Sequence, residues 1–280
     1  MLKNLCFHSH NNFCDGKNSI DEMIQSAVNM NVTHFGISSH APLKFINKWS
    51  MNHDDLQKYS DEIDNAKLKF GNKIQIYKSL EIDYIEDLSY PFEYFKKKIG
   101  LDYTIGSIHL VLNKENKKLW FIDGNIEECH QNFKNVFDSN IYKAITSYYS
   151  QIRKMIKTQK PDIIGHIDKI VMNTANVFFN ENENWYLDEI NKTLDVVKKH
   201  GCIMEVNARG LYKNKWNTSF PSPTILSIAN SKNIPIIITT DAHHTSEIIA
   251  KYDETAIIAK SAGYKHQTIY DNYSWKEIKL

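Results

Sequence analysis

Short apolar segments alternate with segments of helical hydrophobic spacing seven times along this chain. The apolar segments read NLCF, THFGIS, KIQIYKSLEI, DYTIGSI, DIIGHI, CIMEVN and IPIIITT, and they begin at residues 4, 33, 73, 102, 162, 202 and 234. The helical segments follow at 19–30, 54–70, 91–99, 126–157, 185–200, 223–231 and 246–262. Strands that are buried on both faces and separated by helices usually pair in parallel. The pattern therefore predicts an α/β fold of seven strand–helix units, arranged as a closed or nearly closed barrel.

The length and composition of the chain fit one such barrel. With 280 residues, 42% of them apolar, the chain can bury one large core, and we expect a single domain over residues 1–280. The final segment, 264–280, alternates apolar and polar residues around Asp271 and Asn272. This alternation predicts a terminal hairpin that packs on the end or the edge of the barrel.

The charge balance and the cysteine content indicate which cellular compartment and which partners to expect. Lys plus Arg number 34 and Asp plus Glu 33, so the chain lacks the basic excess of proteins that grip nucleic-acid phosphates. The four cysteines form no C-x-x-C pair, and we expect reduced thiols. No apolar run reaches the ~18 residues of a membrane span, and the first residues lack the apolar core of a signal peptide. We therefore expect a cytoplasmic protein without a membrane or nucleic-acid partner, and the sequence carries no information on its oligomeric state.

Imidazole and acidic side chains stand where the expected strands end. In chain order they are His8 and His10, His40, Glu81, His109, His166, Asn207, and Asp241 with His243. The C-terminal ends of parallel barrel strands converge on one face, which carries the active site of barrel enzymes. We therefore expect these side chains to meet in space.

The mixture of residue types predicts metal binding. Neutral imidazole nitrogens together with carboxylate oxygens suit zinc, manganese or iron, whereas magnesium and calcium sites are mainly oxygen. One ion takes about four or five ligands, so the set predicts two or three divalent ions that share a carboxylate. Clustered ions of this kind typically catalyse hydrolysis at phosphorus.

Taken singly, each of these residues has a simpler interpretation. The H-x-H pair can be two hydrogen-bonded imidazoles on one face, and Glu81 can be an ordinary surface carboxylate. Their shared position at strand ends favours the metal interpretation. We expect His243 rather than His244 beside Asp241, because alternate residues of an extended segment share a face.

The motifs together resemble a known superfamily. The H-x-H pair at 8–10, SSHAPL with His40, SLEIDYIED with Glu81, GSIHLV with His109, IGHIDKI with His166 and TTDAHH with Asp241 and His243 resemble the polymerase and histidinol phosphatase (PHP) superfamily. HAPL, LEIDYI and EVNARGLYK resemble its monofunctional histidinol-phosphate phosphatases, and the order and spacing hold over essentially the whole chain.

The resemblance implies a distorted (β/α)7 barrel with three metal ions. The implied ligand sets are His8, His10, Glu81 and Asp241 for the first ion, Glu81, His109 and His166 for the second, and Asp15, His40 and His243 for the third. Asp15 is a departure, because many histidinol phosphatases carry a histidine one residue later.

The segment after the sixth strand supplies cations for a substrate. Arg209 can hold a phosphate by two hydrogen bonds and Lys213 can add a point charge, although both residues can also be ordinary surface cations. The family's Gly-Leu-Arg-Lys run reads GLYK here, with the arginine placed before the glycine. We expect Arg209 and Lys213 to bind substrate.

The resemblance implies a metal-dependent phosphomonoesterase that hydrolyses L-histidinol phosphate to L-histidinol and phosphate in histidine biosynthesis. A hydroxide that bridges two ions would attack phosphorus, and the expected catalytic residues are Glu81, Asp241, His243 and Arg209. Two alternatives remain open. One is a PHP phosphoesterase, nuclease or nucleotidase with another small phosphate or nucleotide substrate, and the other is a non-catalytic module with a structural metal site.

Overall fold

The computed structural model of the protein describes residues 4–280. Seven strands form one sheet in the order β1-β2-β3-β4-β7-β8-β9, and every neighbouring pair is parallel. The strands are β1 Asn4–Cys6, β2 Val32–Ile37, β3 Gln75–Asp83, β4 Tyr103–Ser107, β7 Ile163–Ile164, β8 Ile203–Asn207 and β9 Ile236–Thr239. The seven strands expected from the sequence are confirmed.

The two outer strands of this sheet approach each other closely enough to nearly close a barrel. Ser9 and Ala242 form a parallel bridge just beyond the ends of β1 and β9. The backbone N–H of His10 donates to the carbonyl of Ala242 at 2.7 Å, and the N–H of Ala242 donates to the carbonyl of His8 at 3.2 Å. The segments that carry the H-x-H and D-A-H motifs are therefore joined directly.

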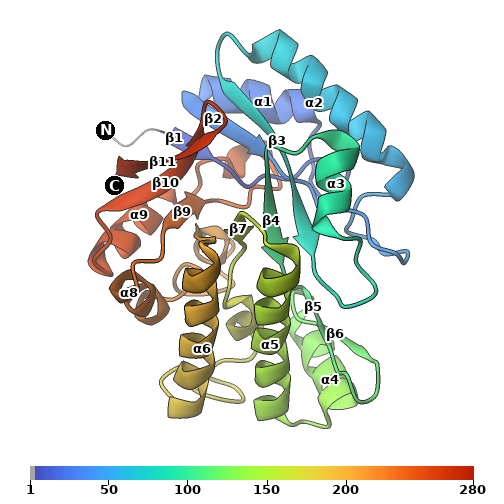
Figure 1. The fold of residues 1–280 in the computed structure, drawn as a ribbon, viewed down its shortest axis with the longest axis vertical. Helices are drawn as coiled ribbons and strands as arrows, with labels where there is room; N and C mark the ends of the chain where they lie inside the picture. Colours follow the sequence, from blue (N-terminus) through green and yellow to red (C-terminus); the bar gives the residue numbers. More distant parts are fainter. Residues whose placement is uncertain (1–3) are drawn as a thin grey trace.

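Helices lie around the outside of the strands (Figure 1). They are α1 Ile20–Asn29, α2 Leu56–Phe70, α3 Phe92–Ile99, α4 Ile126–Phe137, α5 Ile141–Gln159, α6 Asn184–His200, α7 Arg209–Tyr212, α8 Pro223–Ser231 and α9 Tyr252–Ser261. Short 3-10 turns occur at η1 His53–Asp55, η2 Lys169–Asn173 and η3 Thr245–Glu247. Among the described residues, no helix is long and apolar enough to cross a bilayer.

The single long helix expected over 126–157 is wrong. Asp138 and Ser139 adopt left-handed backbone conformations, with φ of 49° and 61°, and they end α4. The side chain of Asn140 then accepts the N–H of Lys143 at 2.9 Å and caps α5. Amphipathic spacing continues through this break, which is why periodicity did not reveal it.

The last helix also starts later than expected over 246–262. His244 caps the short turn η3, and Lys251 adopts a left-handed conformation with φ of 56° immediately before α9. The apolar spacing of the η3 segment reflects burial of Ile248 rather than a helix.

The terminal hairpin is confirmed. Strands β10 His266–Asp271 and β11 Ser274–Lys279 pair in antiparallel register. The ring of Tyr270 packs on Tyr77 and Tyr103, at centroid distances of 5.1 and 5.7 Å. Tyr77 and Tyr103 lie near the starts of β3 and β4. The hairpin therefore covers the N-terminal end of the barrel and leaves the opposite end open for a site.

A second hairpin, which the sequence analysis did not find, follows β4. It consists of β5 Leu110–Leu112 and β6 Leu119–Phe121. The ring of Phe121 stacks on Trp49 at 5.1 Å, within a small apolar cluster separate from the main core. This hairpin belongs to the end of the barrel at which the strands terminate.

Candidate metal centre

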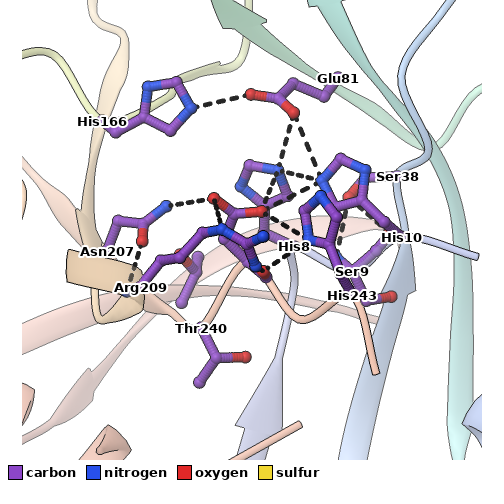
Figure 2. A network of polar contacts seen from close by, with 12 residues as sticks. His8, Ser9, His10, Ser38, Glu81, His166, Asn207, Arg209, Thr240 and His243 are labelled. Carbon is purple, nitrogen blue, oxygen red and sulfur yellow. Dashed lines mark hydrogen bonds and ion pairs between the residues drawn. The ribbon is translucent and has the colours of Figure 1, made fainter. Parts of the chain in front are cut away.

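The expected ligand residues lie together at the C-terminal ends of the barrel strands. Figure 2 shows the side chains of His8, His10, Glu81, His166 and His243 gathered in one place. Eight of them are buried: His8, His10, His40, Glu81, His109, His166, Asp241 and His243. Asp15 lies at the rim, with 37% of its side chain exposed. His244 is exposed and bonds Ser246, so His243 is the histidine that faces the cluster.

Glu81 lies at the centre of the cluster. Its Oε2 atom lies 3.2 Å from His8 Nε2, 3.4 Å from His10 Nε2 and 3.2 Å from His40 Nδ1. Its Oε1 atom lies 3.0 Å from His166 Nε2 and 3.8 Å from His109 Nε2. One carboxylate thus faces imidazoles from both sides, as a carboxylate shared between ions would.

Three groups of side chains have ligand atoms close enough to surround an ion. Within each group the atoms lie within 4.8 Å of one another, and the groups are His8, His10 and Glu81; His40, Glu81 and His109; and His10, Asp15, His40 and His243. The third group contains the whole set expected for the third ion. Asp241 Oδ1 lies 3.2 Å from His10 Nε2, which places it beside the first group.

The chemistry of these atoms fits cations. Within the described chain, buried atoms of this cluster that form no hydrogen bond include Asp15 Oδ1, His40 Nδ1 and Asp241 Oδ1. Buried polar atoms are normally paired, so unpaired acceptors in one cluster indicate a missing positive partner. The donor set of imidazoles and carboxylates is the one that zinc, manganese and iron accept.

Electrostatics support the same interpretation. Burial lowers the pKa of His40 to about 3 and that of His243 to about 4, so both imidazoles are neutral at pH 7 and keep a free lone pair. Burial favours the neutral form of Glu81, but the charges of the surrounding imidazoles outweigh it and hold the pKa of Glu81 well below its ordinary value. The centre therefore offers two neutral imidazoles, His40 and His243, beside an ionised carboxylate, whereas the surrounding charges raise the pKa of His8 and His109 against the effect of burial.

Two buried carboxylates that the sequence analysis missed orient the histidines. Glu205, on β8, accepts the Nδ1–H of His8 at 2.6 Å, which leaves His8 Nε2 facing Glu81. Asp83, at the end of β3, lies 2.9 Å from Nδ1 of His109 and also accepts its backbone N–H at 2.9 Å. Such partners fix the tautomer of a metal-binding histidine. For Glu205 the sequence did carry a signal: it is an acid inside an apolar strand, and it lies two residues before Asn207 and so on the same face of the strand.

The expected substrate cations differ in their surroundings. Arg209 is 17% exposed, and its Nη1 donates to the carbonyl of Asp241 at 2.8 Å and to Tyr212 at 3.0 Å. Lys213 is 35% exposed and its ammonium contacts the carboxylate of Glu247. Arg209 thus lies against the metal centre, whereas Lys213 lies against an acid at its rim.

Comparisons with known proteins agree with this architecture. The model of the PHP domain family matches residues 6–209, which is more than half of the chain. A histidinol-phosphatase of Bacillus subtilis (strain 168) is 24% identical over 268 residues, which cover 88% of this chain and 96% of that protein.

Solved structures show the same fold. A Listeria monocytogenes protein superposes with a TM-score of 0.76 at 22% identity, covering 89% of this chain and 99% of its own. The histidinol phosphate phosphatase of Lactococcus lactis, solved with zinc, L-histidinol and phosphate, superposes with a TM-score of 0.74 at 16% identity, covering 99% and 100% of the two chains. At these identities the structural likeness establishes the fold alone. On the family match over residues 6–209, this chain belongs to the PHP domain family.

Proposed function

We propose that this protein is a metal-dependent phosphomonoesterase that hydrolyses L-histidinol phosphate to L-histidinol and phosphate. The observation that carries the proposal is the cluster around Glu81, in which imidazoles approach both carboxylate oxygens of one buried side chain. The names of the relatives favour this substrate: the Bacillus subtilis relative is a histidinol-phosphatase, and the Lactococcus lactis structure holds L-histidinol and phosphate.

We propose that the expected residues hold two or three divalent ions. The ligand sets are His8, His10, Glu81 and Asp241; Glu81, His109 and His166; and Asp15, His40 and His243. Zinc or manganese bound there would act as a Lewis acid toward phosphoryl oxygens and supply a hydroxide near neutral pH.

The protein's own groups would position the phosphate. Arg209 uses both hydrogens of Nη1 within the fold, and within the described residues its Nη2 has no partner, so the two N–H donors of Nη2 remain for phosphoryl oxygens. Lys213 stays a prediction as a substrate contact, because an anion would have to compete with Glu247 for its ammonium. Asp241 and His243 remain the candidates for delivering a proton to the leaving alkoxide.

A substrate panel tests the proposal. The purified protein, supplied with zinc or manganese, should hydrolyse L-histidinol phosphate with a far higher kcat/KM than common sugar phosphates. Equal rates across the panel would contradict L-histidinol phosphate as the substrate, but would still agree with a general phosphoesterase activity. Faster cleavage of nucleotides or short oligonucleotides would favour the nuclease or nucleotidase alternative.

A pair of glutamate variants tests whether the cluster carries the activity. Glu81→Ala should lose bound metal and turnover together, because Glu81 is 1% exposed and contacts both sides of the centre. Glu189→Ala is the matched control, since Glu189 is 5% exposed and pairs with Arg153 between α5 and α6, away from the expected ligands. An active Glu81→Ala protein would refute the metal-dependent mechanism.

A further inference from the structure

Lys169 is a buried lysine close to the metal centre. It begins the turn η2 and is 3% exposed. Its backbone N–H donates to the carbonyl of His166 at 2.8 Å, so the same turn carries a predicted metal ligand and this ammonium. Burying an ammonium is costly unless charged partners compensate for the lost hydration, so its position calls for a partner.

Three charged groups act on the ammonium of Lys169: Asp123, Asp241 and Arg209. Its Nζ lies 3.0 Å from the Oδ2 atom of Asp123, which comes two residues after β6. Burial favours the uncharged amine, but Asp123 and Asp241 outweigh it and raise the pKa of Lys169, while the nearby guanidinium of Arg209 opposes them. The charge of Asp123 also acts on Arg209. Lys169 and Arg209 are therefore both under the influence of Asp123 and of Asp241, a predicted metal ligand.

The ammonium of Lys169 has more N–H donors than its one ion-pair partner among the described residues can use. An ammonium carries three N–H donors, and among residues 4–280 Asp123 is its one ion-pair partner. Asp123 is itself shared, because Lys215 lies 3.7 Å from its Oδ1 atom. Asp123 is 24% exposed and Lys215 46% exposed, so solvent and solutes reach this carboxylate. An anion that enters beside this carboxylate would compete with it for the ammonium of Lys169, while Lys215 could keep Asp123 paired.

We propose that Lys169 and Arg209 together bind the phosphoryl group of the substrate, and that Asp123 neutralises Lys169 when no anion is bound. The inference rests on the proposed function only in that the substrate is a phosphate monoester. It adds a phosphate contact that sequence reasoning missed, in a position more buried than that of Lys213.

Inorganic phosphate is the probe, and its Kd for the zinc-loaded protein is measured by calorimetry. Lys169→Met should weaken phosphate binding roughly tenfold to hundredfold, the usual effect of losing a charge-assisted hydrogen bond. Lys169→Arg should restore part of the affinity. Asp123→Asn should bind phosphate as tightly as the wild type or more tightly, because the substitution removes a carboxylate that repels the anion and competes for Lys169.

Lys78→Met is the matched control. Lys78 is also buried, at 4% exposure, and its Nζ lies 2.7 Å from the Oδ2 atom of Asp64 and 2.7 Å from the hydroxyl of Ser60, both on α2 outside the barrel. This variant should keep the wild-type Kd for phosphate. Zinc content is measured for every variant, so that a change in Kd is compared at equal metal loading.

A purely structural role for Lys169 predicts a different pattern. If Lys169 only anchors the β5–β6 hairpin through Asp123, then Lys169→Met and Asp123→Asn should weaken phosphate binding alike. That result, or an unchanged Kd in Lys169→Met, would overturn the inference. If Lys169→Met does not fold, weaker phosphate binding by Asp123→Asn is enough to overturn it. The probe contains no histidinol, so a wild type that binds phosphate but does not cleave L-histidinol phosphate would refute the proposed substrate alone.

Discussion

Replacing Glu205 by glutamine should reverse the tautomer of His8 and so weaken metal binding. The carboxylate of Glu205 is fully buried, and the described residues give it four donors. His8 Nδ1 and the hydroxyl of Thr239 each bond Oε1 at 2.6 Å, while the backbone N–H of His166 and the side-chain amide of Asn207 bond Oε2 at 2.6 and 3.1 Å. A glutamine can offer an oxygen to only one of these two pairs of donors, and its NH2 group must face the other pair.

The orientation of that glutamine amide is dictated by its partners. The N–H of His166 can only donate, and the amide of Asn207 cannot flip because its oxygen accepts the N–H of Arg209 at 2.8 Å. The glutamine oxygen must therefore face this side, and its NH2 group must face Thr239 and His8. The hydroxyl of Thr239 can rotate and accept, but His8 Nδ1 must then lose its proton. In the neutral imidazole that a metal ion requires, the one remaining proton then sits on Nε2, the atom that faces Glu81 at 3.2 Å.

The expected magnitude follows from the role of such carboxylates. Losing the partner that orients a metal-binding histidine usually weakens metal affinity about 10- to 100-fold, which corresponds to about 1.4 to 2.8 kcal/mol. Competition with a chelator of known affinity measures the zinc affinity, and histidine 15N chemical shifts report the tautomer. Glu189→Gln, which changes a buried carboxylate on α6, is the control. Wild-type zinc affinity in a folded Glu205→Gln protein would refute the reasoning.

Three further predictions concern the same centre and its support. Asp83→Asn should lower the zinc affinity roughly tenfold, because His109 loses the carboxylate 2.9 Å from its Nδ1; unchanged affinity would contradict the orienting role. Zinc binding at pH 7 should release about three protons per chain and tighten as pH rises. Against burial, the surrounding groups raise the pKa of His8 to about 10, that of His109 to about 9 and that of His10 well above its ordinary value in the metal-free protein. Calorimetry in buffers of different ionisation enthalpy measures this release, and a pH-independent affinity would contradict it. Tyr59→Phe should lower the free energy of unfolding by about 1 to 3 kcal/mol in urea, since the buried hydroxyl bonds backbone carbonyls of β2 and β3 at 3.1 and 2.8 Å, whereas Tyr142→Phe, at an exposed tyrosine, should have little effect.

The sequence alone was enough to predict the barrel architecture and the end of the barrel at which the candidate site lies. Hydrophobic periodicity is a local property, so alternating apolar and amphipathic segments were enough to predict seven parallel strands. Polar residues at the ends of those strands, such as His40 and Glu81, then had to converge, because parallel strands in a barrel end on the same face. That argument needs neither strand register nor side-chain rotamers.

The partners of the site residues depended on the tertiary structure. Glu205 reaches His8 because β1 and β9 approach each other and nearly close the barrel, and 197 positions separate the two residues in the chain. Local sequence around Glu205 shows only an acid in an apolar strand.

The surroundings of the cations were decided in the same way. Lys213 lies against Glu247 from the segment after β9, and Lys169 meets Asp123 from a hairpin that periodicity did not reveal. An ion pair depends on which loops the fold brings together, and no local pattern encodes that. The sequence therefore determined which residue types gather at the strand ends of this barrel, while the packing of its loops decided which charged groups pair with those residues and which keep unpaired donors.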